Sequence, residues 1–333
     1  MKKIFQRIGI GLGLIAVLYV GIYYITFPKY EFHSNIDLNQ DFDSFYKSKL
    51  EETKSKKGRI GSEEKLIRFS PAKTEYAILY IHGFGASRAE GEATVDKIAS
   101  KFKANTYYLR LPGHGTNNED HRDTPFSEYL RVAEETFLMM DKLGNHTILM
   151  GTSMGGLIST YLAAKYPDKT KILVLYSPFY DFTVPLARIF FYPGGTEFGE
   201  TVQGKIRKSP PKKPDDGIGE HYYEYWYKDQ YLAAVRHVSE ATKFVLGQDP
   251  LPKITSPTLL VYYYKDKDHQ DKTASVAAML DAFSKIGGEH PNPLNTKVAI
   301  EEGSHVLTST HVHSDKEKVE SAVLDFLKKA GVR

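Results

Sequence analysis

The stretch LMGTSMGGLIST, Leu149 to Thr160, holds a serine between two glycines in the pattern G-T-S-M-G. The apolar run His146–Met150 precedes it, and the residues after it favour a helix. A sharp turn between a strand and a helix is the setting in which a G-x-S-x-G pattern presents a nucleophile. A serine in a glycine-rich turn is otherwise an ordinary turn residue, so a catalytic interpretation needs partners elsewhere in the chain.

The composition is that of a folded protein. The 333 residues are 41% hydrophobic and 26% charged, which argues against wholesale disorder. No cysteine is present, so disulfides, thiolate catalysis and cysteine metal sites are excluded. The formal net charge is +3, but four basic residues and no acid fall in the first thirty positions, which leaves the rest close to neutral. We therefore expect no nucleic-acid partner.

The amino-terminal segment predicts a membrane helix. Ile8–Phe27 comprises twenty uncharged residues, about the length that crosses a bilayer core. A cleaved secretory signal is the alternative, but no A-x-A-like site follows, so a retained anchor over residues 1–30 is favoured. Lys2, Lys3 and Arg7 precede the span, and basic flanks stay in the cytoplasm. Both interpretations place the remaining chain outside the cytoplasm, anchored in one case and secreted in the other.

The rest of the chain alternates short β-rich runs with longer amphipathic stretches. This order predicts an α/β fold with a mostly parallel sheet covered by helices on both faces. We expect a Lys-rich stalk and the first strands over 31–74, and an α/β core over 75–180 and 256–333. No G-x-G-x-x-G or Walker A pattern occurs in a suitable setting, so no nucleotide cofactor is expected. The expected core strands are Glu75–Ile81, Asn105–Leu111, His146–Met150, Lys171–Tyr176, Pro257–Tyr264 and Thr296–Ile300.

An insertion over residues 181–255 interrupts the alternation. It shows no clear strand, contains the Pro- and Lys-rich piece KIRKSPPKKPDD, and is too long for an idle connection. We expect it to form a helical lid. Its aromatic side chains would suit an apolar acyl chain, or would simply pack the lid onto the core: Phe190, Phe191, Tyr222, Tyr223, Tyr225 and Trp226.

Ser153 needs a base and an acid to act as a nucleophile. His305 follows the last expected strand, and Asp266 follows the strand before it. The carboxyl ends of parallel strands meet in one crevice, and the order serine, acid, histidine is the one expected of such a fold. Asp268 is the reserve for the acid, because Asp266, Asp268 and Asp271 share one loop and two of them are expected to be solvated.

An attacked acyl group also needs N–H donors for its developing negative charge. The loop YIHGFGAS follows a strand, and Gly83 and Gly85 let its backbone turn sharply. The N–H groups of Phe84 and Met154 are the expected donors of the oxyanion hole. His82 is expected to orient this loop by hydrogen bonding.

Taken together, HGFG, LPGHGTNNED, GTSMGG, YYYKDKDHQD and GSHV resemble the α/β-hydrolases, most of all bacterial carboxylesterases and monoacylglycerol lipases. The resemblance runs from about residue 75 to the end. It implies an eight-stranded sheet with an inserted lid, and cleavage of small-molecule or lipid acyl esters without cofactor or metal. It also implies that Ser153 is the nucleophile, Asp266 the acid and His305 the base, with Phe84 and Met154 forming the oxyanion hole.

Two other function classes stay open at this stage. The same triad serves acyl transfer to an alcohol other than water, or hydrolysis of amides or thioesters. A membrane-tethered binding module without catalysis is the non-enzyme alternative, and an intact triad argues against it.

Overall fold

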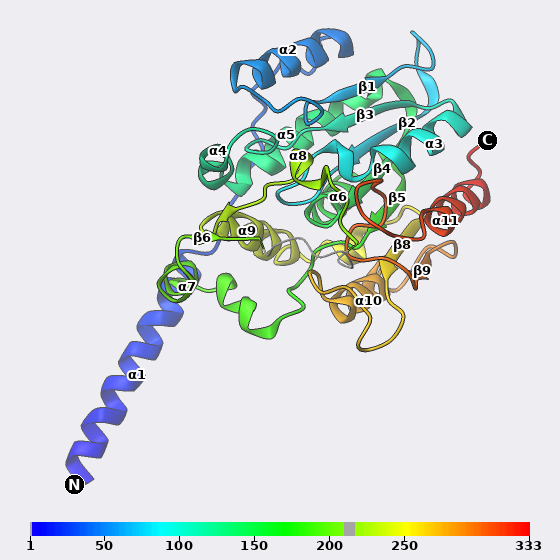
Figure 1. Cartoon of the computed structure of the whole chain (residues 1–333). Coiled ribbons are helices and arrows are strands. Elements are labelled where there is room, and N and C mark those ends of the chain that lie inside the picture. Colours follow the sequence, from blue (N-terminus) through cyan, green and yellow to red (C-terminus); the bar gives the residue numbers. More distant parts are fainter. Residues whose placement is uncertain (1, 210–216) are drawn as a thin grey trace.

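The structure is a computed structural model and describes residues 2–209 and 217–333. A seven-stranded sheet forms its centre (Figure 1). The order is β1-β3-β2-β4-β5-β8-β9, and all neighbours are parallel except β1 and β3. The sheet therefore has one strand fewer than the resemblance implies. The strands are β1 (Lys65–Ile67), β2 (Thr74–Ile81), β3 (Asn105–Leu109), β4 (Gly144–Thr152), β5 (Thr170–Tyr176), β8 (Thr258–Tyr263) and β9 (Thr296–Ile300).

The six expected core strands are confirmed as β2, β3, β4, β5, β8 and β9. Their near-continuous apolar runs reflect burial on both faces of the sheet. In β2, Ala77, Leu79 and Ile81 join the core on one side. Ile78 and Tyr80 alternate with them and join the core on the other side. One strand thus supplies two hydrophobic layers.

Helices cover both faces of the sheet (Figure 1). α3 and α11 pack together over one face, and α5, α6, α9 and α10 contribute to the core on the other. The helices of this layer arrangement are α3 (Glu92–Phe102), α5 (Phe126–Met139), α6 (Met154–Lys165), α9 (Ala234–Leu246), α10 (Val276–Lys285) and α11 (Lys316–Lys329). Short elements between them are the turns η1 (Arg88–Glu90), η2 (Met140–Lys142) and η4 (Leu251–Lys253) and the helix α4 (Asn118–Asp123).

The segment expected to be a loose stalk is part of the core. It contains helix α2 (Phe42–Ser55), whose first turn is capped by the Asp41 carboxylate accepting from the Ser44 N–H at 2.8 Å. Phe42 and Phe45 are buried, with ring centroids 5.2 and 6.0 Å from that of Tyr107 in β3. The abundant lysines of this segment masked its two apolar anchors, because a short helix needs only one buried stripe.

Residues 181–255 lie between β5 and β8, as expected. The Pro- and Lys-rich piece expected there falls partly outside the described residues. The insertion also contains a two-stranded antiparallel pair that the sequence analysis did not anticipate. Besides α9 and η4, its elements are η3 (Pro185–Phe191), α7 (Gly195–Gln203), β6 (Ile206–Arg207), α8 (Tyr222–Tyr225) and β7 (Gln230–Tyr231).

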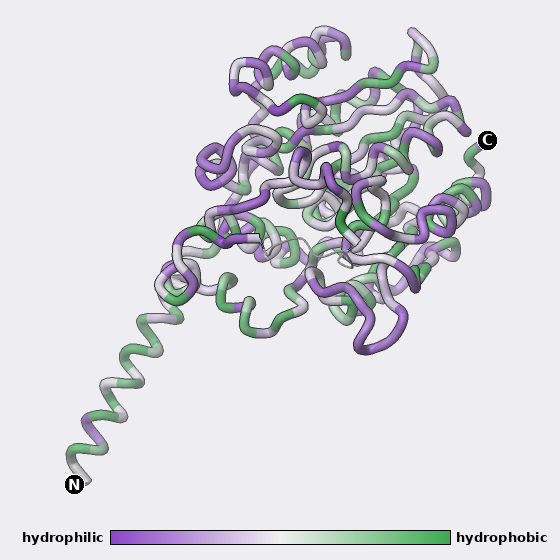
Figure 2. The backbone as a smooth tube through the Cα atoms, in the orientation of Figure 1, coloured by the Kyte–Doolittle hydropathy of each residue, from purple (hydrophilic) through white to green (hydrophobic). Residues whose placement is uncertain are grey.

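Helix α1 (Lys2–Ile25) projects away from the domain (Figure 1). Figure 2 shows that hydrophobic residues line most of its length. Within the described residues it is the one helix long and apolar enough to cross a membrane, over Ile4–Ile25, and none of its best window is buried in the protein. A membrane anchor and a signal sequence both have this character.

Candidate active site

Ser153 stands on a strained turn between β4 and α6. Its backbone has φ 54° and ψ −118°, a conformation that L-residues rarely adopt. The flanking glycines allow the close packing of this turn: a Cβ on Gly155 would lie 2.0 Å from the Ile81 carbonyl oxygen, and one on Gly151 would lie 2.4 Å from the Gly155 carbonyl oxygen. The Ser153 N–H donates to the Tyr176 carbonyl at 3.0 Å, which ties the turn to β5. The G-x-S-x-G pattern therefore builds the expected elbow.

His305 is held by Asp271. The Nδ1 of His305 lies 2.6 Å from Oδ2 of Asp271, and the Asp271 side chain is completely buried. The other oxygen of that carboxylate, Oδ1, accepts from the N–H groups of Thr273 at 2.7 Å and Ala274 at 2.9 Å. Both carboxylate oxygens are thus engaged, and the carboxylate has one orientation toward the imidazole.

Asp266 does not contact His305, so the expected pairing is wrong. Its carboxylate is half exposed and instead lies 2.8 Å from the Nδ1 of His269. Its Oδ1 also accepts from the N–H groups of Asp268 at 2.9 Å and His269 at 2.8 Å. Asp268, the reserve, is on the same exposed turn. These residues form a self-contained surface turn separate from the Asp271–His305 pair.

The chain returns to the sheet before it reaches Asp271. Lys265 and Gln270 flank a tight turn in which the Lys265 N–H donates to the His269 carbonyl at 2.9 Å. Tyr264 then bridges to Gln270, and the Asp271 N–H donates to the Tyr263 carbonyl at 3.3 Å. Asp271 therefore lies beside the last residue of β8, although eight positions separate it from Tyr263 in sequence.

A second buried carboxylate, Glu90, lies at the loop YIHGFGAS, residues 80–87, which we call the oxyanion loop. Its Oε2 accepts from the Gly83 N–H at 2.5 Å and from the Tyr80 hydroxyl at 3.4 Å. A Cβ on Gly83 would lie 2.9 Å from Oε1 of Glu90 and 3.0 Å from the Cβ of Ser153. Gly83 is thus wedged between the nucleophile turn and Glu90. No sequence pattern marks Glu90, because only its burial distinguishes it from the many surface acids.

The turn η1 also joins the oxyanion loop to the segment after His305. The Thr308 hydroxyl donates to the Glu90 carbonyl at 2.6 Å, and the Ser309 hydroxyl donates to the Ala89 carbonyl at 2.8 Å. Thr308 and Ser309 are completely buried, so these bonds are shielded from water. These two hydrogen bonds fix the segment that follows His305 relative to the loop that contains Phe84.

Electrostatics at the site stabilise the protonated form of His305 relative to the free side chain. Burial by itself lowers the pKa of His305, but the attraction and hydrogen bond of Asp271 and the charge of Glu90 outweigh burial and raise that pKa above its usual value. Burial raises the pKa of Glu90 to about 7, against the stabilising bond from Gly83 and the nearby His305. Two groups whose ionisation depends on each other thus lie within one buried site.

The role of Phe84 and Met154 as oxyanion donors stays a prediction. Met154 is the first residue of α6, and the first N–H groups of a helix have no partner within it. Phe84 follows Gly83, whose own N–H is taken by Glu90. A helix N-terminus also carries a partial positive charge that stabilises an anion.

His82 orients the oxyanion loop. The Leu111 N–H donates to Nε2 of His82 at 3.1 Å, so the other ring nitrogen carries the hydrogen and Nδ1 donates to the Gly83 carbonyl at 2.8 Å. Burial lowers the pKa of His82 to about 4, which keeps the ring neutral. The geometry agrees with the role expected from the sequence.

The insertion contacts both site loops. The Tyr227 N–H donates to the Gly85 carbonyl at 2.9 Å, and Trp226 packs in one buried cluster with Ala86 and Val306. Tyr222 stacks on Trp226 with ring centroids 4.2 Å apart. Tyr222 and Trp226 therefore fasten the insertion over the oxyanion loop and the residue after His305.

A second group of aromatic side chains runs from the serine turn into the insertion. The Phe179 N–H donates to the Ser153 carbonyl at 2.9 Å. The ring of Phe179 lies 4.9 Å from that of Phe182, which in turn lies 6.2 Å from Phe190 and 5.2 Å from Phe191 in η3. A series of contacting aromatic rings thus links the nucleophile turn to the η3 end of the insertion.

The described residues contain no group of three or more histidine, aspartate or glutamate side chains placed to hold a metal ion. The groups at the site include a serine on an elbow and an imidazole oriented by a carboxylate, which are residue types used in acyl transfer.

The family model described as Alpha/beta hydrolase family matches residues 78–320. A pimeloyl-[acyl-carrier protein] methyl ester esterase of Neisseria meningitidis serogroup A is 24% identical over 204 residues, 57% of this chain and 61% of that protein. The thermostable monoacylglycerol lipase of Bacillus sp. strain H-257 is 31% identical over 91 residues, 27% of this chain and 36% of that protein. The match thus covers less than two thirds of either relative.

Solved structures share the fold. One of the two metagenome-derived lipolytic enzymes LipS and LipT superposes with a TM-score of 0.61 at 18% identity, over 82% of this chain and 99% of that one. The monoacylglycerol lipase of Paleococcus ferrophilus gives a TM-score of 0.56 at 14% identity, over 80% and 98%. With a family model that spans most of the chain, a parallel sheet of this order and a serine elbow after β4, the chain belongs to the alpha/beta hydrolase family.

Proposed function

We propose that the protein is a serine hydrolase that cleaves carboxylic esters through an acyl-enzyme intermediate. The observations that carry the proposal are a strained elbow at Ser153 and an imidazole, His305, that a buried carboxylate, Asp271, orients at 2.6 Å. Relatives named as esterases and a monoacylglycerol lipase support the same chemistry. The acid of the proposed triad is Asp271, not Asp266.

The mechanism follows from the roles of these groups. His305 takes the proton of the Ser153 hydroxyl, and the serine oxygen attacks the ester carbonyl. The N–H groups of Phe84 and Met154 stabilise the oxyanion, and His305 returns the proton to the leaving alcohol. Water then attacks the acyl-enzyme with His305 again as base, which releases the acid. Asp271 holds Nδ1 of His305 and stabilises the imidazolium in both steps.

The aromatic group from Phe179 to Phe191 supports an apolar acyl chain as the substrate class. These rings lie on the path that leads from the serine turn to η3, where a chain extending from an acylated Ser153 would be covered by apolar surface. Monoacylglycerols and related single-chain esters combine such a chain with a small alcohol. This preference is a property of the insertion and is separable from the triad.

We further propose that α1 is a retained membrane anchor and that the catalytic domain lies outside the cytoplasm. The exposed apolar surface of Ile4–Ile25 and the basic residues at the start of the chain support this topology. Carbonate washing of membranes would leave an anchored chain behind, and an intact mass of the mature protein would exclude cleavage. A protein found in the soluble fraction with a new N-terminus would be a secreted form instead.

Hydrolysis of p-nitrophenyl esters of increasing acyl length by the full chain in detergent tests the proposal, with Ser153→Ala as the matched control. We expect turnover by the wild type, at least about a thousandfold loss in the variant, and a rate that rises with chain length. A phosphonate that labels Ser153 without any ester turnover would favour acyl transfer, or amide or thioester substrates. Absence of both labelling and turnover would favour a binding module.

A further inference from the structure

Exposed apolar side chains gather on one part of the insertion. Outside α1, the described residues include nine large hydrophobic side chains that are exposed, and six of them fall between positions 184 and 206. Isolated exposed hydrophobics are ordinary, but a contiguous patch marks an interaction site. We call these six the insertion surface: Val184, Leu186, Tyr192, Phe198, Val202 and Ile206.

The insertion surface adjoins the end of α1. The Tyr19 hydroxyl donates to the Pro193 carbonyl at 3.2 Å, and the ring of Tyr23 lies 5.9 Å from that of Tyr192. Lys243 of α9 lies 4.3 Å from the centroid of the Tyr23 ring. The end of the apolar helix therefore contacts α9 and the connection between η3 and α7, and in Figure 1 it leaves the domain beside α7.

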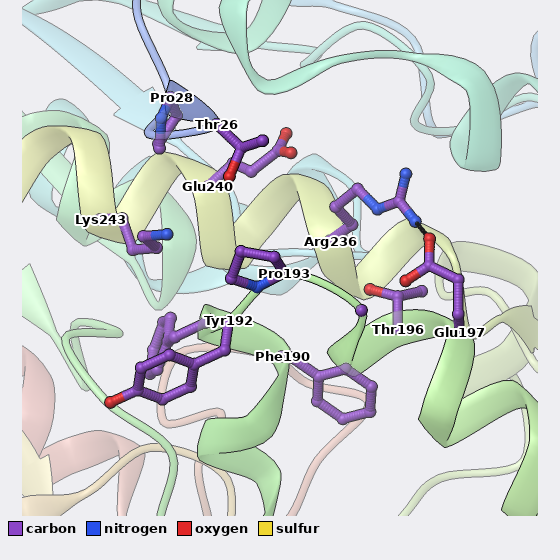
Figure 3. A pocket seen from close by; sticks show the side chains of 12 residues that line it. Thr26, Pro28, Phe190, Tyr192, Pro193, Thr196, Glu197, Arg236, Glu240 and Lys243 are labelled. Atoms are coloured by element: carbon purple, nitrogen blue, oxygen red, sulfur yellow. Dashed lines mark hydrogen bonds and ion pairs between the residues drawn. The ribbon is translucent and has the colours of Figure 1, made fainter. Parts of the chain in front are cut away.

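A cavity of about 310 Å³ opens at this junction. Thr26 and Pro28 border it on the side of α1, and Tyr192, Arg236 and Lys243 border it on the side of the insertion and α9 (Figure 3). Neither Ser153 nor His305 lines it. The cavity thus belongs to the contact between α1 and the insertion, at the level where the apolar helix ends.

The charges near the insertion surface suit a phospholipid headgroup layer. Lys205, Arg207 and Lys208 are all exposed and follow α7 directly. Helix α7 carries two acids, Glu197, which is paired with Arg236, and Glu200, so the three basic residues still outnumber the remaining acid. Apolar side chains bordered by basic ones are the composition by which a segment lies in a membrane interface rather than across it.

We propose that the insertion surface rests in the headgroup layer of the bilayer that holds α1. The proposal rests on the membrane anchor proposed above and goes beyond it, because an anchor by itself does not place any part of the insertion in the bilayer. Two fixed contacts, α1 and the insertion surface, hold the domain in one orientation. In that orientation the η3 end of the Phe179–Phe191 aromatic group faces the membrane, so single-chain lipid esters reach it from the bilayer.

The chain contains no cysteine, so single introduced cysteines report depth without background labelling. Leu186→Cys and Val202→Cys, whose native side chains are 75% and 65% exposed, are labelled with a polarity-sensitive fluorophore in the full chain. The protein is reconstituted into vesicles of phosphatidylcholine and phosphatidylglycerol that carry a nitroxide at the headgroup or along the acyl chain. Hydrolysis of a soluble p-nitrophenyl ester by each variant verifies the fold.

Two matched positions calibrate the quenching. Val17→Cys, from an exposed side chain of α1, reports the acyl region. Phe69→Cys, on the loop after β1 that Figure 1 places at the far end of the domain from α1, reports the aqueous phase. We expect the probes at Leu186 and Val202 to be quenched by the headgroup nitroxide at least about threefold more than the probe at Phe69.

Quenching at Leu186 and Val202 no greater than at Phe69, with strong quenching at Val17, would overturn the proposal while leaving the anchor intact. Absence of quenching at Val17 would overturn the anchor and this proposal together. Neither outcome bears on ester hydrolysis, which the Ser153→Ala comparison tests separately. Quenching that requires phosphatidylglycerol would assign the contact to the basic residues, and quenching in phosphatidylcholine alone would assign it to the apolar ones; both support the proposal.

Discussion

Replacing Asp271 by asparagine should disable the site through the tautomer of His305. Oδ1 of Asp271 accepts from the N–H groups of Thr273 and Ala274, at 2.7 and 2.9 Å, and these groups only donate. The carbonyl oxygen of the introduced amide must therefore take the place of Oδ1, which turns its NH₂ group toward His305. The imidazole then presents a bare Nδ1 to the amide and a hydrogen on Nε2, the nitrogen that has to accept the serine proton.

We expect Asp271→Asn to lower kcat by about 10³–10⁴-fold, which corresponds to about 4–5.5 kcal/mol of transition-state stabilisation. The matched control is Asp266→Asn, because Asp266 has the same charge and belongs to the same loop but is half exposed and bonded to His269. The control should retain kcat within about twofold. Steady-state hydrolysis of a p-nitrophenyl ester gives both values, and thermal melting verifies that each variant is folded.

Loss of activity in Asp266→Asn with retention in Asp271→Asn would refute the reasoning, since the site would then have to rearrange to bring the outer carboxylate to His305. Equal and modest losses in both would refute the tautomer argument. Asp271→Glu is informative beside them: it keeps the acceptor but displaces it, so a loss smaller than that of the asparagine variant is expected.

Three further predictions concern pH and stability. Asp271 is the main cause of the raised pKa of His305, and Glu90 adds to it. Glu90→Gln can still accept from Gly83 but loses this smaller contribution, so the acid limb of kcat/KM should move to lower pH by less than about one unit. Burial lowers the pKa of His121 to about 3 in the folded protein. As the pH falls below about 6.5, the unfolded chain therefore takes up this proton before the folded protein does, and the folded state loses stability. His121→Phe removes this effect and should reduce the drop in Tm between pH 7.5 and 5 by ~2–4 °C. An unchanged pH profile of Tm would contradict this. Glu64→Leu strips Arg110 of a buried partner at 3.1 Å and should cost about 3–5 kcal/mol in denaturant unfolding, most of which Arg110→Met should restore in the double variant.

The sheet and the serine elbow could be predicted because local rules and tertiary packing agree there. The strands of the sheet centre are buried on both faces and therefore show as apolar runs, and the elbow needs glycines at fixed offsets from Ser153. Helix α2 was missed for the opposite reason. Only two of its apolar side chains, Phe42 and Phe45, are fully buried, and charged and polar residues lie around them in sequence. A segment held by two anchors has too weak a periodicity to be recognised alone.

Glu90 illustrates what sequence patterns leave out of a site. Its importance lies in burial and in bonds to Gly83 and, through its carbonyl, to Thr308, which lies 218 residues further along the chain. No spacing rule links such positions, because the contact arises from the way α3 and the segment after β9 pack on the sheet. The charge it contributes to His305 became recognisable only once the fold had been built.

The choice between Asp266 and Asp271 depends on where the chain turns, not on how far it runs past a strand. Counting from the end of β8 favours Asp266, since the first acid after a strand would lie nearest the sheet edge if the chain ran straight on. The chain instead doubles back: Tyr264 bridges Gln270, and Asp271 donates its N–H to Tyr263. The turn projects Asp266 into solvent and brings Asp271 to the strand end, where it is fully buried. An acid that must hold an imidazole is protected from water, so burial selects the residue that sequence distance passes over.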